Sequence, residues 1–181
     1  MRLHYKACVV LGVLAVLMAL TPASQAQIVS NQATVNLNAV LGESLTVIAG
    51  PGTVNFALLP AGVSNGSSPV AITTSWTLGP ARTQVNLYAY FLSPVALTDG
   101  GGNNIPSANV RGSVNAGPFG AFTGGVGPFG ANSVQVFNQA IAAANRNSSR
   151  ADSLALQIDT AGLGLPAGTY TGVLNIQAQA L

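Results

Sequence analysis

Charged and catalytic side chains are scarce in this chain, and the reactive ones stand at its start. The 181 residues contain one His and one Cys, and His4, Lys6 and Cys8 all lie in the first eight positions. Later positions contain no Lys, His or Cys. A chain without these side chains cannot form a His or Cys metal site. It also lacks a Cys nucleophile and a His general base.

The remaining charges are balanced. Beyond the first eight residues, the basic and acidic side chains are Arg82, Arg111, Arg146 and Arg150 against Glu43, Asp99, Asp152 and Asp159. The formal net charge of +2 therefore arises at the start of the chain. A neutral remainder argues against a basic surface that binds nucleic acid.

Residues 1–26 are typical of a secretory signal peptide. Arg2 and Lys6 supply a positive start, and the apolar run CVVLGVLAVLMAL follows. This run is shorter than the roughly 20 residues that a membrane-spanning helix needs. Cleavage after Ala26 would leave Gln27 first, although an uncleaved anchor is the alternative. We therefore expect a secreted protein that passes through the periplasm to the cell surface or beyond, with no membrane span in the mature chain.

The mature chain, residues 27–181, is large enough for one domain without disulfides. Apolar and polar residues alternate with a period of two in many segments, which is the pattern of half-buried strands. Gly, Pro and Asn between the segments favour turns. Several short strands and no long helix predict an all-β antiparallel sandwich or barrel. The alternating segments are residues 33–41, 45–47, 54–58, 70–78, 85–91, 154–158 and 170–178.

A Gly- and Phe-rich insertion spans residues 112–131. The sequence GPFGA occurs twice in it, beginning at Gly117 and again at Gly127. One interpretation is a loop or bulged hairpin that its Phe rings pin to the sheet. The other is an exposed contact surface, since aromatic residues are enriched at interface hot spots. Its anchors would be Phe119, Phe122 and Phe129.

Tyr88 and Tyr90 share one face of a predicted strand with Asn86, and are candidates for a binding or packing surface. Trp76 lies on the same face of its predicted strand as Val70 and Ile72, which favours a place in the core over a sugar-stacking position. An alternative to a structural role is therefore a secreted carbohydrate- or surface-binding module. That module would use the two Tyr rings and the Phe-rich loop.

Carboxylates are the remaining route to catalysis or metal binding. Asp152 and Asp159 are an odd number of residues apart, so they would face opposite sides of one strand; turns at its ends are the preferred placement. Asp99 lies in the loop TDGGGNN, which lacks the repeated acidic ligands of an EF-hand. We predict no enzyme activity, no metal site and no cofactor.

Both ends of the mature chain carry alternating segments that resemble edge strands. The first includes Val35, Leu37 and Ala39, and the last is predicted to run from Gly168 to Leu181 with Tyr170, Leu174 and Ile176 on it. Unpaired terminal strands favour pairing with another chain. We therefore predict self-association, in which a strand of one subunit completes the sheet of the next.

The segments that carry these strands also resemble a known family. The sequence LPAGTYTGVLNI at residues 165–176 is similar to the C-terminal strand of the spore coat protein U-like family, and ATVNLNA at residues 33–39 is similar to its first strand. These are secreted, pilin-like subunits associated with chaperone–usher assembly. The resemblance implies an Ig-like β-sandwich with a non-enzymatic, fimbrial role on the bacterial surface. The partners it implies are other pilin-like subunits, a periplasmic chaperone and an usher.

Overall fold

The computed structural model describes residues 30–124 and 129–181, so the predicted signal peptide lies outside the described residues. The chain divides into two units, Met1–Ala39 and Val40–Leu181. Residues 30–39 of the first unit form no helix or strand. The second unit contains the strands β1 (Ser44–Gly50), β2 (Val63–Asn65), β3 (Val70–Thr77), β4 (Gln84–Tyr90), β5 (Val95–Thr98), β6 (Asn104–Pro106), β7 (Val110–Val114), β8 (Gly120–Ala121), β9 (Ser133–Ala140), β10 (Asn147–Asp159) and β11 (Asn175–Ala180).

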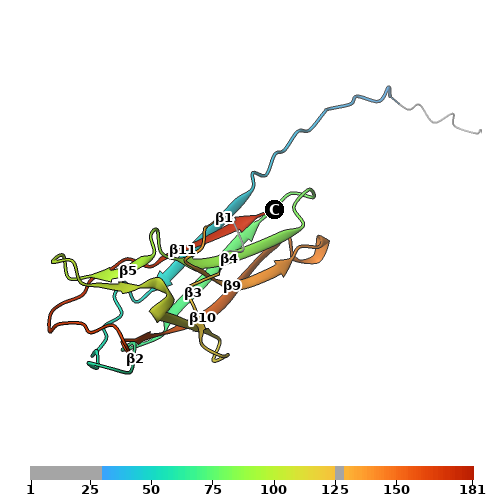
Figure 1. Cartoon of the computed structure of the whole chain (residues 1–181). Helices are drawn as coiled ribbons and strands as arrows, with labels where there is room; N and C mark the ends of the chain where they lie inside the picture. Colours follow the sequence, from blue (N-terminus) through green and yellow to red (C-terminus); the bar gives the residue numbers. More distant parts are fainter. Residues whose placement is uncertain (1–29, 125–128) are drawn as a thin grey trace, which may run out of the picture. The chain divides into compact units, whose positions relative to one another are not determined.

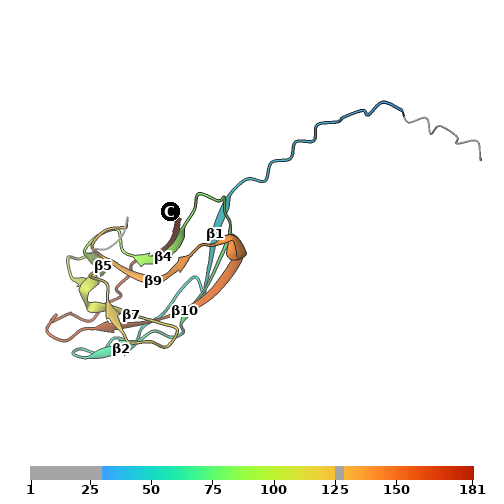
Figure 2. The ribbon, with the colours of Figure 1, turned by 90° about the vertical axis from the view of Figure 1, so that its right-hand side faces the viewer.

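Two antiparallel sheets make up most of the second unit (Figure 1). The larger sheet has the order β1-β3-β10-β7-β8, with β2 paired to β10. The smaller sheet has the order β11-β4-β9, and β5 and β6 form a hairpin. Figure 2 shows β4 and β9 in one layer and β7 and β10 in the other. The prediction of an all-β, antiparallel fold is confirmed, and the two layers are sandwich-like.

The core lies between the two sheets; burial follows the predicted alternation on β3, whereas both faces of β4 are buried. On β3, Ile72 and Trp76 are buried, and on β4, Leu87 and Ala89 are buried. Burial of one such large side chain contributes about 1.5–3 kcal/mol to folding. The Trp76 indole Nε1 donates a hydrogen bond to the carbonyl oxygen of Asn145 (2.8 Å), so its polar atom is satisfied within the core.

The predicted terminal strands differ from those observed. Residues 33–41 form no hydrogen-bonded strand, and β1 begins at Ser44. The last strand covers Asn175–Ala180, although the alternation predicted a start near Gly168. Before β11 the chain crosses to the hairpin instead, where Thr171 and Thr98 exchange two backbone hydrogen bonds of 2.9 Å.

Gly172 allows this crossing because it carries no side chain. A Cβ atom on Gly172 would collide with the carbonyl oxygen of Ala96 on β5. Neither backbone can retreat without breaking the bonds between Thr171 and Thr98. The close approach therefore fixes the position of the chain that leads into β11.

We predict that Gly172→Ala lowers the free energy of unfolding by about 1–3 kcal/mol, the usual cost of overpacking. The measurement is urea denaturation. Gly168→Ala is the matched control, because the nearest heavy atom to its added Cβ is 3.9 Å away. Equal midpoints for the two variants would contradict a tight contact at Gly172.

Candidate functional site

The two sheets are linked along one side of the sandwich. Gly124, which follows β8, donates its N–H to the carbonyl oxygen of Ser133 at the start of β9 (3.0 Å). The Ser133 hydroxyl donates to the carbonyl oxygens of Gly124 and Gly130 (both 2.9 Å). These bonds close the seam between β8 and β9.

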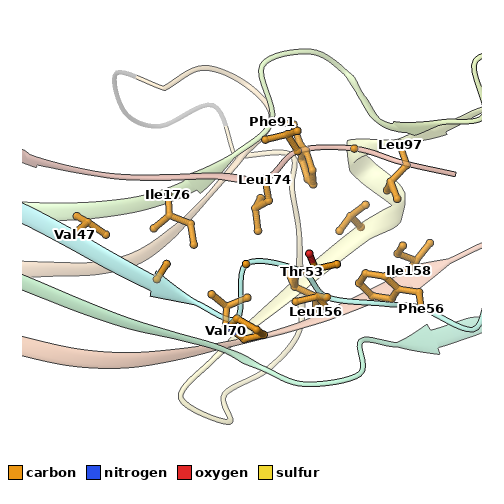
Figure 3. A pocket seen from close by; sticks show the side chains of 17 residues that line it. Val47, Thr53, Phe56, Val70, Phe91, Leu97, Leu156, Ile158, Leu174 and Ile176 are labelled. Carbon is orange, nitrogen blue, oxygen red and sulfur yellow. The ribbon is translucent and has the colours of Figure 1, made fainter.

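The opposite seam, between β1 and β11, is open in the sense that no backbone ladder joins the two strands, although they lie close together. Each of these edge strands pairs with one neighbour, β1 with β3 and β11 with β4. Between them lies a groove with a volume of about 450 Å³. In Figure 3, Leu174 and Ile176 from one sheet and Val70 and Leu156 from the other point into this space. The groove therefore reaches core side chains of both sheets.

The side chains that line the groove are almost all apolar. Thr53 supplies the one polar side chain in its lining. Small-molecule sites usually place several convergent polar groups that orient the ligand. A second hollow of about 540 Å³ shares Phe56, Leu97 and Ile158 with the groove and continues it toward Tyr170. A long apolar trough of this kind suits an extended chain better than a compact ligand.

An ion pair joins the ends of the two edge strands. Glu43, just before β1, accepts hydrogen bonds from the Arg82 guanidinium (3.1 and 3.2 Å) and from the N–H of Gly79 (2.6 Å). Arg82 also donates to the carbonyl oxygen of Ala180 on β11 (3.5 Å). The pair joins the two edge strands where β1 begins and β11 ends. The bonds from Arg82 first, and then that from Gly79, lower the pKa of Glu43.

The segment that precedes β1 exposes its apolar side chains. Val35 is 81% exposed and Leu37 is 93% exposed. The polar residues Thr34, Asn36 and Asn38 alternate with them, as the sequence predicted. Exposed aliphatic side chains at every second position are those of a half-buried strand that has no partner.

Two of the three predicted assembly residues near the C-terminus line the groove. Leu174 and Ile176 are on its smaller-sheet wall. Tyr170 lines the second hollow, where its hydroxyl donates to the carbonyl oxygen of Pro166 (3.0 Å). The structure thus brings these residues to the open seam, although Tyr170 and Leu174 precede β11 itself.

The five aromatic candidates are not gathered on one exposed surface. Phe122 is fully buried and packs edge-on against Phe91, with ring centroids 5.1 Å apart. Phe129 stacks on Tyr90 (5.0 Å) and lies 5.3 Å from Tyr88. Tyr88 is buried, and its hydroxyl accepts a bond from Gln135. Phe119 remains partly exposed, so most of these rings pack the insertion against the sandwich.

The carboxylates are each held by donor groups. Asp152 and Asp159 both lie on β10, rather than in the expected turns, and face opposite sides of the sheet. Arg150 contacts the buried Asp152 at 2.9 Å, and Arg111 contacts Asp159 at 3.1 Å. The pairing leaves neither carboxylate in position to act with the other as an acid–base pair.

The Asp99 carboxylate accepts hydrogen bonds from nitrogen atoms of its own loop. The donors are the Asn103 side chain (2.6 Å) and the N–H groups of Gly101 and Asn103. The bond from Asn103 is the main cause that lowers the pKa of Asp99. Residues 30–124 and 129–181 contain no group of three or more His, Cys, Asp or Glu side chains arranged to hold a metal. Within the same ranges, no helix has the length and hydropathy required to cross a membrane.

Comparison with models of known protein families gives no match, and comparison with curated proteins gives no significant match. The function is therefore inferred from the groove and the exposed segment. Sequence patterns identified Leu174 and Ile176 but missed the opposite wall, including Val47 and Val54. The sequence alternation predicts that both side chains face inward, but no neighbouring residue indicates that the edge of their sheet lacks a partner strand.

We predict that Glu43 contributes to stability above its ordinary pKa of about 4.5, and that this contribution is lost as pH falls through its lowered folded pKa. Thermal denaturation between pH 6 and pH 3 measures the effect. The melting temperature of Glu43→Gln should fall less on acidification than that of the parent. Equal falls would show that Glu43 has the same pKa in the folded and unfolded chain.

We predict different roles for two Phe residues of the insertion. Phe122→Ala should lower the free energy of unfolding by about 3–5 kcal/mol, because it leaves a cavity in the core. Phe119→Ala, at a site that is 40% exposed, should cost about 1 kcal/mol or less. Urea denaturation compares them, and similar costs would contradict the assignment of Phe122 to the core.

Proposed function

We propose that this protein is an exported, non-enzymatic structural subunit that assembles by strand insertion. The segment before β1 of one copy enters the groove between β1 and β11 of a second copy. Repetition of this contact builds a chain of subunits. The observation that carries the proposal is that one molecule combines an open apolar seam with an exposed, alternating apolar segment.

The segment and the groove agree in length. Residues 33–41 would span roughly 26 Å as a strand, at about 3.3 Å per residue. On the β1 side the groove is lined from Val47 to Val54, a stretch of similar length. An inserted strand of this length would therefore cover the groove.

The segment and the groove also agree in polarity. One face of the segment carries Ala33, Val35, Leu37, Ala39 and Leu41, and these side chains would enter the apolar groove. Transfer of such side chains out of water contributes about 25 cal/mol per Å² of apolar surface. The other face carries Thr34, Asn36 and Asn38, which would remain toward solvent. The apolar face of the segment, which is exposed in one copy, would thus be buried in the groove of the next.

The edges of the groove supply backbone partners. The outer sides of β1 and β11 have no strand neighbour within the described residues. Free N–H and C=O groups at a sheet edge are a template for an added strand. In β-strand addition these bonds supply affinity and the side-chain pockets supply specificity.

The direction of insertion follows from the ends of the groove. The Glu43–Arg82 pair lies where β1 begins and β11 finishes, and the exposed Val40 and Leu41 of the acceptor precede Glu43 in the chain. A donor strand antiparallel to β11 leaves the groove at the opposite end, where the rest of the donor has room. Repetition of this insertion would then give a head-to-tail chain.

The non-enzymatic role has separate support. Arg82, Arg111 and Arg150 pair with three of the carboxylates, and backbone and amide N–H groups hold Asp99. The sequence after residue 8 contains no His, Cys or Lys. Covalent and acid–base catalysis rely mainly on these side chains or on freely placed carboxylates.

The resemblance to spore coat protein U-like subunits extends the proposal. In this reading the sandwich is Ig-like and lacks one strand, and residues 1–26 direct export to the periplasm. A periplasmic chaperone would occupy the groove until an usher brings a second subunit to the cell surface. An apolar groove in a secreted subunit supports such protection, because exposed core is an aggregation hazard.

The alternative, a carbohydrate- or surface-binding module, has less support. Such a module needs aromatic faces open to a sugar ring. Tyr88 is buried, and Phe129 covers the face of Tyr90.

We predict that Leu37→Asp abolishes assembly and leaves the fold intact. The side chain is 93% exposed in the free segment, but it would bury an unpaired charge in the groove of the next copy. Asn38→Asp is the matched control, because it places the same charge on the solvent face of the same segment. Size-exclusion chromatography and electron microscopy measure assembly, and circular dichroism measures the fold.

A mixing experiment separates the two halves of the contact. Subunits with Leu37→Asp keep an intact groove, so they should accept a strand but not donate one. Added to the parent protein during assembly, they should shorten the chains in proportion to their share. If Leu37→Asp and Asn38→Asp assemble equally well, the proposed function is wrong.

A further inference from the structure

The groove alone does not explain one residue of the exposed segment, Val40. Thr34, Asn36 and Asn38 are polar on the face that would remain toward solvent, but Val40 on the same face is apolar. It is 88% exposed in the free subunit. The groove gives no reason for an aliphatic side chain at this position.

A small apolar surface lies beside the groove. Leu92 is 83% exposed, Val173 is 73% exposed, and Val95 is more than one-third exposed. These three residues, called here the Leu92 patch, border a shallow hollow of about 280 Å³. The hollow shares Phe91, Leu97 and Val173 with the groove, so the patch is continuous with it.

The geometry of insertion brings Val40 to this patch. A donor strand antiparallel to β11 that starts opposite Ala180 with Ala33 reaches Gly172 with Leu41. Val40 then lies opposite Val173. Leu174, which precedes β11, and Ile176 on β11 line the groove. Val173 borders both the groove and the shallow hollow and is 73% exposed, so it is accessible to a strand added at this edge. If the alternation continues through both segments, Val173 faces the side opposite Leu174, as Val40 does relative to Leu41 in the donor.

We propose that Val40 of one copy packs on the Leu92 patch of the next, and that this contact sets the register of the inserted strand. The inference rests on the proposed function and adds a second apolar contact outside the groove. In this register Val40 pairs with Val173, Asn38 with Asn175, and Asn36 with Gln177. The partner is a second copy of this chain.

The register matches polarity at every outer position. Polar side chains oppose polar ones, and the one apolar residue of the donor face opposes Val173. A shift by two residues would place Val40 opposite either Asn175 or Thr171, and the second shift would also set Asn38 against Val173. The Asn175 amide nitrogen is buried and has no acceptor in the free subunit, and Asn38 carries a carbonyl oxygen that could serve it. Cross-strand side-chain pairs of this kind stabilise one register of a sheet over the alternatives.

Disulfide trapping between two single-cysteine variants tests the register. Both are made in the full chain with Cys8→Ser, so that the introduced thiol is alone. One carries Val40→Cys and the other Val173→Cys, and they are refolded together under oxidising conditions. Directly opposed residues have Cα atoms about 4.5–5.5 Å apart, which suits a disulfide. Each variant refolded alone shows the background of symmetric disulfides.

We expect a covalent dimer from the mixture, at about ten times the yield from the control mixture of Val40→Cys with Asn175→Cys. The control residue lies on the same face of β11 but at a diagonal separation of about 7–8 Å. A higher yield from the control would overturn the register and leave strand insertion standing. Assembly that depends on Leu37 but gives no disulfide in either mixture would overturn the contact with the patch. Failure of all mixtures to assemble would overturn the proposed function as well.

A second measurement does not depend on cysteine. Val40→Thr keeps the shape of the side chain and replaces a methyl group by a hydroxyl, and it should speed dissociation of assembled chains by roughly fivefold. Leu92→Ser should act similarly, and the double variant should be no faster than the single ones, because the two side chains share one contact. Multiplicative effects of the two changes would contradict a shared contact.

Discussion

The open seam between β1 and β11 is the constraint on which the rest of the structure depends. Two sheets can bury their apolar faces against each other, but each still has edges whose backbone groups and adjacent side chains need cover. On one side the chain supplies this cover through Gly124 and Ser133. On the other side, β1 and β11 have no further strand neighbour within residues 30–124 and 129–181, and Leu174 and Ile176 line the groove. In the proposed assembly, a strand from another molecule supplies this cover.

The scarcity of charge is consistent with this constraint. Ion pairs at the surface contribute little, about 0–1 kcal/mol each, and they weaken with salt. Here the pair of Glu43 with Arg82 joins the two edge strands where β1 begins and β11 ends. The proposed contact, made of inserted apolar side chains and backbone hydrogen bonds, would not need charged surfaces.

Much of the interior could be predicted from the sequence, because alternation reports which side chains share a face. Ile72, Trp76, Leu87 and Ala89 were expected inside and are buried. The Phe-rich insertion could not be resolved in this way. Phe119 and Phe122 are three residues apart in the same glycine-rich stretch, yet one is partly exposed and the other is completely buried. Their difference depends on Phe91, which belongs to a distant part of the chain.

The sequence by itself determined the all-β class, the inward and outward faces of most strands, and the absence of His, Cys and Lys after residue 8. Only the tertiary structure decided which strands have neighbours on both sides. Residues 33–41 and 85–91 show the same alternation, but the second segment lies between β9 and β11 and the first pairs with no strand. The physical reason is that alternation is a property of neighbouring residues, whereas strand pairing joins residues far apart in the chain.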